Sequence, residues 1–416
     1  MKKNLVAFAV AAAVLVPGAA FAASSNSDTG PVLYGYAQIT GAQQFATGPS
    51  SSNGLIFGAN RIRLGVKGEA VKGVTYNIMA GWDEASIYGN TGVSGDLLNN
   101  GLGSVHGNNA QVLDAWLNYA PVPFAQLEAG KFKQPVGNEY VDTAGNELPF
   151  IFRSMGQSLL PGRSAGVMVH GENVMGSGVS YALAIADTSS LDGYNAYSWY
   201  NNGSMPFGSG QGGFLNGHGQ YLFSARLGYD FMGPLLKAEI SGSRMGLNSY
   251  PYGIPSSSIY TWNVGIHGGL MGIHYAAGYT NLNSGRSFDS RLVGNYTNGM
   301  VATDWNVGLG ANLYEMTLLP ASLDIEPVVR FDSFSYNNHN GVDEKLDNTT
   351  VGVNYYVNPN NPHAAELQLD YIIPTARSGK FGPYSTASAA DVFGGNGAPI
   401  NGMAYNTLML QLQAGF

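Results

Sequence analysis

The stretch 406-NTLMLQLQAGF-416 alternates apolar and polar residues up to its last position. Leu408 and every second residue as far as Phe416 share one side of an extended strand, and the residues between them share the other side. In a closed barrel the final strand must pair with the first, because every backbone group within lipid needs a partner. The stretch therefore predicts the closing strand of a transmembrane β-barrel. A soluble protein that ends on a strand is the alternative.

The first residues follow the pattern of a secretory signal peptide. Lys2 and Lys3 form a positive start, residues 5–16 form an apolar run, and Ala-Phe-Ala at 20–22 gives a small-residue cleavage pattern. The apolar run is shorter than the roughly 20 residues that a spanning helix needs. We expect cleavage of residues 1–22 and export of residues 23–416 as a single barrel domain.

Composition narrows the class of exported protein. The chain has no Cys, so it has neither disulfides nor thiolate metal ligands. Gly occurs 58 times and Tyr 25 times, and only 11% of the residues are charged. A barrel can cross a membrane with such a composition, because alternate residues face lipid and lumen.

Alternating segments recur along the chain and predict sixteen strands. They lie near residues 32–45, 56–69, 73–85, 110–120, 124–133, 164–171, 177–187, 219–231, 235–245, 258–268, 271–281, 301–315, 321–335, 347–358, 364–374 and 402–416. The connections alternate between long and short, as in outer-membrane barrels with long external loops and short periplasmic turns. The predicted fold class is therefore all-β: an antiparallel sixteen-stranded barrel in the bacterial outer membrane.

Barrels of this strand number enclose a water-filled channel. The connection between the fifth and sixth strands, residues 134–163, contains "LPFIF" and "LL" among polar residues. We expect this segment to fold into the lumen and to narrow the channel as a constriction loop. An external cap or a contact between subunits is the alternative.

Four stretches resemble the phosphate-selective porin O and P family: "NRIRLGVKGEAVKGVTYNIMAGWD", "VLDAWLNYAPVPFAQLEAGKFKQPVG", "RSMGQSLLPGRSAGVMVHG" and "TTVGVNYYVNPNNPHAAELQLDY". The resemblance implies an outer-membrane porin, a homotrimer, through which small hydrophilic solutes and ions diffuse passively. It also implies permeation of phosphate or other anions along a basic lumen.

The charges leave the ion preference open. Removal of Lys2 and Lys3 with the signal peptide leaves 17 of the 19 Lys and Arg residues against 27 Asp and Glu. The candidates for pore lining and selectivity are Arg61, Arg63, Lys67, Lys131, Lys133, Arg153, Arg163, Arg226, Arg330, Asp83 and Asp114. Each of them could instead form an ion pair that only solvates the wall. A non-specific or weakly cation-selective porin is therefore the alternative to an anion channel.

Other functions have less support in the sequence. His267 and His274 alternate inward on adjacent strands, but no third metal ligand lies near them in sequence. We expect no catalytic residues, no metal, no cofactor and no nucleic-acid partner; a barrel enzyme or a structural outer-membrane protein is the remaining alternative. Aromatic residues that alternate outward predict girdles at the two membrane interfaces: Tyr34, Trp82, Tyr119, Tyr229, Tyr279, Tyr355 and Tyr371.

Overall fold

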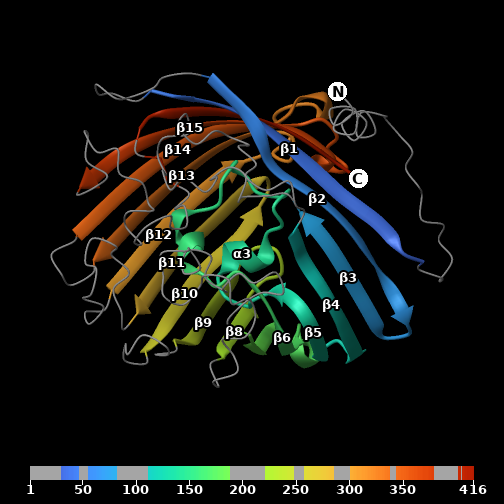
Figure 1. Ribbon diagram of the computed structural model, residues 1–416. Helices are drawn as coiled ribbons and strands as arrows, with labels where there is room; N and C mark the ends of the chain where they lie inside the picture. Colours follow the sequence, from blue (N-terminus) through green and yellow to red (C-terminus); the bar gives the residue numbers. More distant parts are fainter. Residues whose placement is uncertain are drawn as a thin grey trace, which may run out of the picture.

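The computed structural model describes residues 30–45, 55–81, 111–187, 221–247, 257–284, 300–337, 343–378, 402–403 and 405–416. The predicted signal peptide, residues 1–22, lies outside these ranges. Within the described ranges, sixteen antiparallel strands form one closed barrel, and each strand pairs with its neighbours in the chain (Figure 1). This confirms the predicted fold class.

All sixteen predicted strands are present. Their bounds are β1 (Val32–Gln44), β2 (Leu55–Val71), β3 (Val74–Gly81), β4 (Gln111–Val122), β5 (Ala125–Lys133), β6 (Arg163–Gly171), β7 (Val179–Ala186), β8 (Leu222–Asp230), β9 (Lys237–Leu247), β10 (Ser257–Leu270), β11 (Ile273–Ser284), β12 (Met300–Ala311), β13 (Asp324–Asn337), β14 (Asp343–Tyr356), β15 (Ala365–Ser378) and β16 (Thr407–Gly415).

The barrel closes between its first and last strands. β1 pairs with β16 in antiparallel register, from Tyr36 opposite Gly415 to Gln44 opposite Thr407. Beyond this ladder, Gly35 and Phe416 exchange two backbone hydrogen bonds of 3.0 and 3.1 Å. The alternating stretch at the end of the chain is thus the closing strand that the sequence predicts.

The wall buries polar side chains on its inner face and exposes apolar side chains on its outer face, which is the reverse of a water-soluble protein. On β16, Gln411 and Gln413 are almost fully buried, whereas Leu410 and Leu412 are 46% and 57% exposed. A large continuous apolar exterior is not compatible with water, but it matches a lipid-facing band. The described helices are short, and none of them has the length and apolar character that crossing a membrane would require.

Two of the register shifts in the wall change the alternation around candidate pore-lining residues. The register between β1 and β2 changes after Gln38, so Asn60 and Arg61 are both buried although they are neighbours in the chain. A similar shift between β3 and β4 buries Leu113 beside Asp114. Each is a β-bulge, in which one extra residue interrupts the two-residue period.

The prediction that Tyr34 faces outward in an aromatic girdle is wrong. Tyr34 faces inward: its hydroxyl donates to Asn77 Oδ1 at 2.6 Å, and the Lys67 amine lies 5.1 Å from its ring. The ring lies over Gly65, where the missing side chain leaves room for it. Tyr119 and Tyr229 are exposed as predicted. Trp82 lies outside the described residues.

Candidate functional site

Residues 134–162, here called the inner loop, leave the wall after β5 and lie inside the ring of strands (Figure 1). At the base of the loop the N–H of Gln134 donates to the Gly162 carbonyl oxygen at 3.1 Å. Gly137 then turns the chain with a φ of 88°, a conformation that favours glycine. A side chain at Gly137 would also collide with Leu160.

Helix α3 (Asn138–Asp142) follows this turn and lies against β9 and β10. The N–H of Gly137 donates to the Ser241 hydroxyl at 3.0 Å, and the N–H of Asn138 donates to Asn263 Oδ1 at 3.3 Å. Wall side chains therefore satisfy backbone donors that the first turn of a helix leaves unpaired.

The middle of the inner loop is held by five amide side chains, here called the amide row. Gln38, Asn60, Asn354, Gln368 and Gln413 donate to the carbonyl oxygens of Gly145, Ile151, Pro149, Leu148 and Asn146, respectively, at 2.7–3.2 Å. These donors lie on β1, β2, β14, β15 and β16, so the row crosses the seam of the barrel. Uncharged groups thus fix the loop to the wall where the chain closes.

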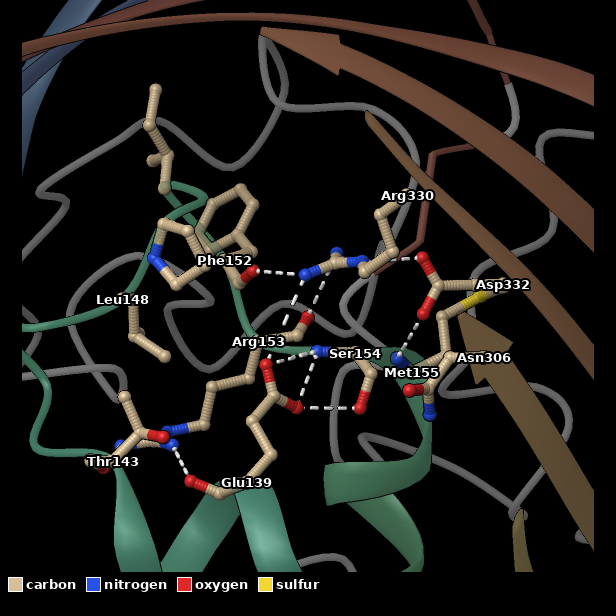
Figure 2. Close-up of polar contacts among 12 residues, drawn as sticks. Glu139, Thr143, Leu148, Phe152, Arg153, Ser154, Met155, Asn306, Arg330 and Asp332 are labelled. Carbon is tan, nitrogen blue, oxygen red and sulfur yellow. Dashed lines mark hydrogen bonds and ion pairs between the residues drawn. The ribbon is translucent and has the colours of Figure 1, made fainter. Parts of the chain in front are cut away.

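Arg330 on β13 holds the next part of the inner loop (Figure 2). Its guanidinium donates to the carbonyl oxygens of Phe152 at 2.8 Å and Arg153 at 3.3 Å. Asp332 accepts from the Arg330 Nε at 2.7 Å and from the N–H of Met155 at 3.3 Å. Since Arg330 and Asp332 are almost fully buried, each satisfies a charge that the other would leave unpaired.

Glu139 of α3 supports the same region from inside the loop. Its carboxylate accepts from the N–H of Ser154 at 2.9 Å and from the Ser154 hydroxyl at 2.6 Å, and it lies 3.9 Å from Arg330 (Figure 2). The 3-10 helix η1 (Met155–Leu159) follows, in contact with β11, β12 and β13. The loop is therefore attached at its start, middle and end.

Three of the predicted cations surround Tyr140 and are here called the Tyr140 cluster: Lys133, Arg153 and Arg163. The Lys133 amine lies 2.7 Å from the Tyr140 carbonyl oxygen and 5.0 Å from its ring centroid. The Arg153 guanidinium lies 5.7 Å from the same ring, and Arg163 donates to the Tyr140 hydroxyl at 3.4 Å. Another cation of this wall, Arg63, lies 5.7 Å from the centroid of the Tyr36 ring.

Asp114 is a carboxylate partner of this cluster and pairs with Arg163 at 2.9 Å. Arg153 donates to two backbone carbonyl oxygens, those of Glu139 and Thr143. The carboxylate of Glu139 accepts from Ser154 and lies near Arg330 (Figure 2). Three cations thus gather around Tyr140.

A second group of charged residues attaches the end of α3 to the wall through ion pairs. Asp142 forms ion pairs with Arg226 and, at 3.1 Å, with Lys237, while His267 lies 3.7 Å away. Arg226 also pairs with Glu239. Burial disfavours the charged form of Asp142, but Arg226 and Lys237 outweigh burial, so the pKa of this carboxyl lies below its usual value.

The remaining candidates lie apart from these groups. Arg61 donates to Gln38 Oε1 at 3.0 Å and to the Ile151 carbonyl oxygen at 3.3 Å, below the inner loop. Lys131 is buried, and its amine donates to the Val112 carbonyl oxygen at 2.6 Å. Lys67 is exposed beside Tyr34, as described above. Asp83 lies outside the described residues.

Buried carboxylates gather on the opposite wall, on β12 to β15. They are Asp304, Asp324, Glu326, Asp332, Glu366 and Asp370. His274 on β11 pairs with Glu326 at 2.8 Å and does not meet His267, because the two histidines occupy different rows of the β10–β11 ladder. Across the described ranges, no three His, Asp or Glu side chains group as metal ligands would. Carboxylates thus predominate on β12 to β15, where Arg330 lies among them, whereas Asp114, Glu128 and Glu239 share the other wall with the cations.

Sequence reasoning missed Tyr140 and the amide row. Alternation places Gln411 and Gln413 on the polar side of the last strand, but it does not indicate that a distant loop supplies the partner groups. Tyr140 follows "GNE" in a segment without periodicity, so its position between three cations has no signal in the sequence.

Solved structures of low sequence identity share this fold. Salmonella typhi OmpF in complex with daunomycin is 13% identical, with a TM-score of 0.58 over 93% of this chain and 97% of that one. An anion-selective porin from Comamonas acidovorans is 12% identical, with a TM-score of 0.57 over 94% and 100%. The in-vitro folded trimer form of OmpT from Vibrio cholerae is 11% identical, with a TM-score of 0.54 over 93% and 99%. No curated protein sequence matches the chain at a significant level.

A closed sixteen-stranded wall with a polar interior and an internal loop defines a porin, a channel through which small hydrophilic solutes cross the outer membrane by passive diffusion. The chain matches the phosphate-selective porin O and P family over residues 38–203 and 301–379, which is more than half of its length. It belongs to that family.

Proposed function

We propose that this porin prefers anions and that the Tyr140 cluster sets the preference. The observation that carries the proposal is the gathering of Lys133, Arg153 and Arg163 around Tyr140, at the inner loop. A field across the lumen orients dipolar solutes, and a ring of cations favours anions. Small anions, phosphate among them, are the expected permeants.

The inner loop narrows the channel in this proposal. The amide row and Arg330 hold the loop through its carbonyl groups. The cluster acts in this proposal through the positive field that its cations set up at the narrow part of the channel. Transport is passive and requires no cofactor. We assign no enzymatic activity, because the family and the fold are those of a channel.

In this proposal the protein forms a homotrimer in the lipid bilayer of the outer membrane. Each chain reaches that membrane after cleavage of residues 1–22. Support for the trimer comes from the OmpT structure described as a trimer form. Support for export comes from the residue pattern of the first 22 positions.

A weakly cation-selective channel is the second candidate. The carboxylates on β12 to β15 favour it, and they outnumber the cations of that wall. The carboxylates and Arg153 are similarly buried, with exposed fractions of 3% or less, so the selectivity measurement rather than burial decides between the two candidates.

Reversal potentials in a potassium chloride gradient distinguish the two candidates. Arg153→Gln removes one charge of the Tyr140 cluster and should move the reversal potential toward cation preference. Lys67→Gln, which removes the same charge away from the cluster, should change it much less. Equal shifts in both variants, or cation preference in the unaltered protein, would reject the proposal.

A further inference from the structure

An arginine faces the membrane side of the wall near the ends of β8, β9 and β10. Arg244 lies opposite Phe223 of β8 and opposite Tyr260 of β10 in the two ladders. Side chains directly opposite each other in antiparallel strands share one face of the sheet. The neighbours of Arg244 in the chain, Ser243 and Met245, are buried on the lumen side, whereas Arg244 is exposed.

This outer row, Phe223, Arg244 and Tyr260, combines aromatic rings with one cation. The Arg244 guanidinium lies 5.9 Å from the centroid of the Tyr260 ring, and both rings are about half exposed. No Asp or Glu within the described residues pairs with Arg244. Lys345 at the same end of the barrel differs, since it forms an ion pair of 3.0 Å with Asp347.

The row lies at the end of the wall that carries the long connections. β8 begins after residues 187–221, and β9 and β10 are joined by residues 248–256. Toward the other end, Leu227, Ile240 and Val264 continue the outer face as an apolar band. An arginine on the lipid face costs about 2–4 kcal/mol at the middle of the bilayer and almost nothing near the interface. Arg244 therefore fits the level of the outer-leaflet headgroups.

We propose that the outer row binds the phosphate of an outer-leaflet glycolipid, of the lipid A type. The guanidinium matches two phosphate oxygens with parallel hydrogen bonds, and basic groups at the membrane surface bind anionic headgroups. Phe223 and Tyr260 flank the guanidinium with flat surfaces for the sugar ring and the first carbons of the acyl chains. Asn283, opposite Tyr260 on β11 and exposed, adds an amide donor. The inference depends on the outer-membrane location and is independent of the proposed anion preference.

The test is a titration of the full-length protein in detergent with fluorescent diphosphoryl lipid A and with its dephosphorylated form. Arg244→Gln should weaken binding of the diphosphoryl form about tenfold, the loss expected for one charged hydrogen-bonded contact. It should leave binding of the dephosphorylated form unchanged. The affinity of Arg244→Lys for the diphosphoryl form should lie between those of Arg244→Gln and the unaltered protein. Lys345→Gln, the matched control, should bind like the unaltered protein.

Three results would overturn the inference. One is that Arg244→Gln binds diphosphoryl lipid A as tightly as the unaltered protein does. The mobility of unheated samples in gel electrophoresis would show that the variant is folded. Another is displacement of lipid A by inorganic phosphate at the same concentration, which would indicate a free-ion site. The third is dissociation of the oligomer in Arg244→Gln with unchanged lipid A affinity, which would make the row a subunit contact. Since Arg244 faces away from the lumen, the reversal potential should not change in any of these variants.

Discussion

The guanidinium of Arg330, in the wall, donates a 2.8 Å hydrogen bond to the carbonyl oxygen of Phe152, in the inner loop. The two residues are far apart in the chain, and the bond attaches a backbone group rather than a side chain. This part of the inner loop is therefore fixed to the wall through its backbone.

Arg330→Gln should loosen the inner loop and destabilise the barrel. The change removes the donors to Phe152 and Arg153 and leaves Asp332 buried without its cation, which costs about 3 kcal/mol. Urea unfolding in lipid vesicles should show this loss, and single-channel currents should become noisier. Arg330→Lys keeps the charge and should lose less stability. Quiet currents in Arg330→Gln would show that the amide row alone holds the loop.

Asp142→Asn should test the attachment of α3 under acid. Because Arg226 and Lys237 lower the pKa of Asp142, the ion pairs contribute fully above the usual Asp value, about 3.9, and are lost as the pH falls through the lower folded-state pKa. Single-channel currents should thus stay steady from pH 7 to about 4 and fluctuate only below it. In Asp142→Asn the fluctuation should be present at every pH. A transition above about pH 5 in the unaltered protein would contradict this assignment.

Gln38→Ala should weaken the closure of the barrel. Gln38 donates to Gln413 across the seam at 2.6 Å and to Gly145 at 3.0 Å, and it accepts from Arg61 at 3.0 Å. Unpaired buried groups left behind should cost about 2 kcal/mol, measurable as an earlier urea midpoint. Thr75→Ala, at a half-buried polar position on β3 away from the seam, serves as the control. Equal midpoints would show that water replaces the lost partners.

Deletion of residues 137–156 should raise single-channel conductance, since it removes the inner loop from the lumen while β5 and β6 keep their ladder. A deletion of equal length within residues 188–220 gives the matched control and should have a smaller effect. Unchanged conductance after removal of the loop would show that another part of the chain sets the width of the channel.

The sequence predicts the wall well because its signal is local. Alternation and the sorting of long and short connections locate sixteen strands, and they place Arg63 and Arg330 inward as the structure has them. Alternation does not predict the β-bulges, because an extra residue such as the one beside Arg61 changes the two-residue period without changing the composition of the strand.

The site was less predictable for a different reason. Its residues come together through the inner loop, whose partners lie on strands far away in the chain. Arg163 and Lys133 are adjacent across a ladder and could be paired from the strand prediction, but their meeting with Tyr140 depends on how the loop turns at Gly137. The number of cations can be read from the sequence, whereas their grouping cannot.

The amide row lies on both sides of the seam, and this has a consequence for assembly. An unclosed sheet would offer the loop the donors of β1 and β2 or those of β14 to β16, but not both sets at once. The loop obtains all its bonds only when the two edges meet. If the inner loop narrows the channel, as proposed, then closing the wall would also set the width of the channel.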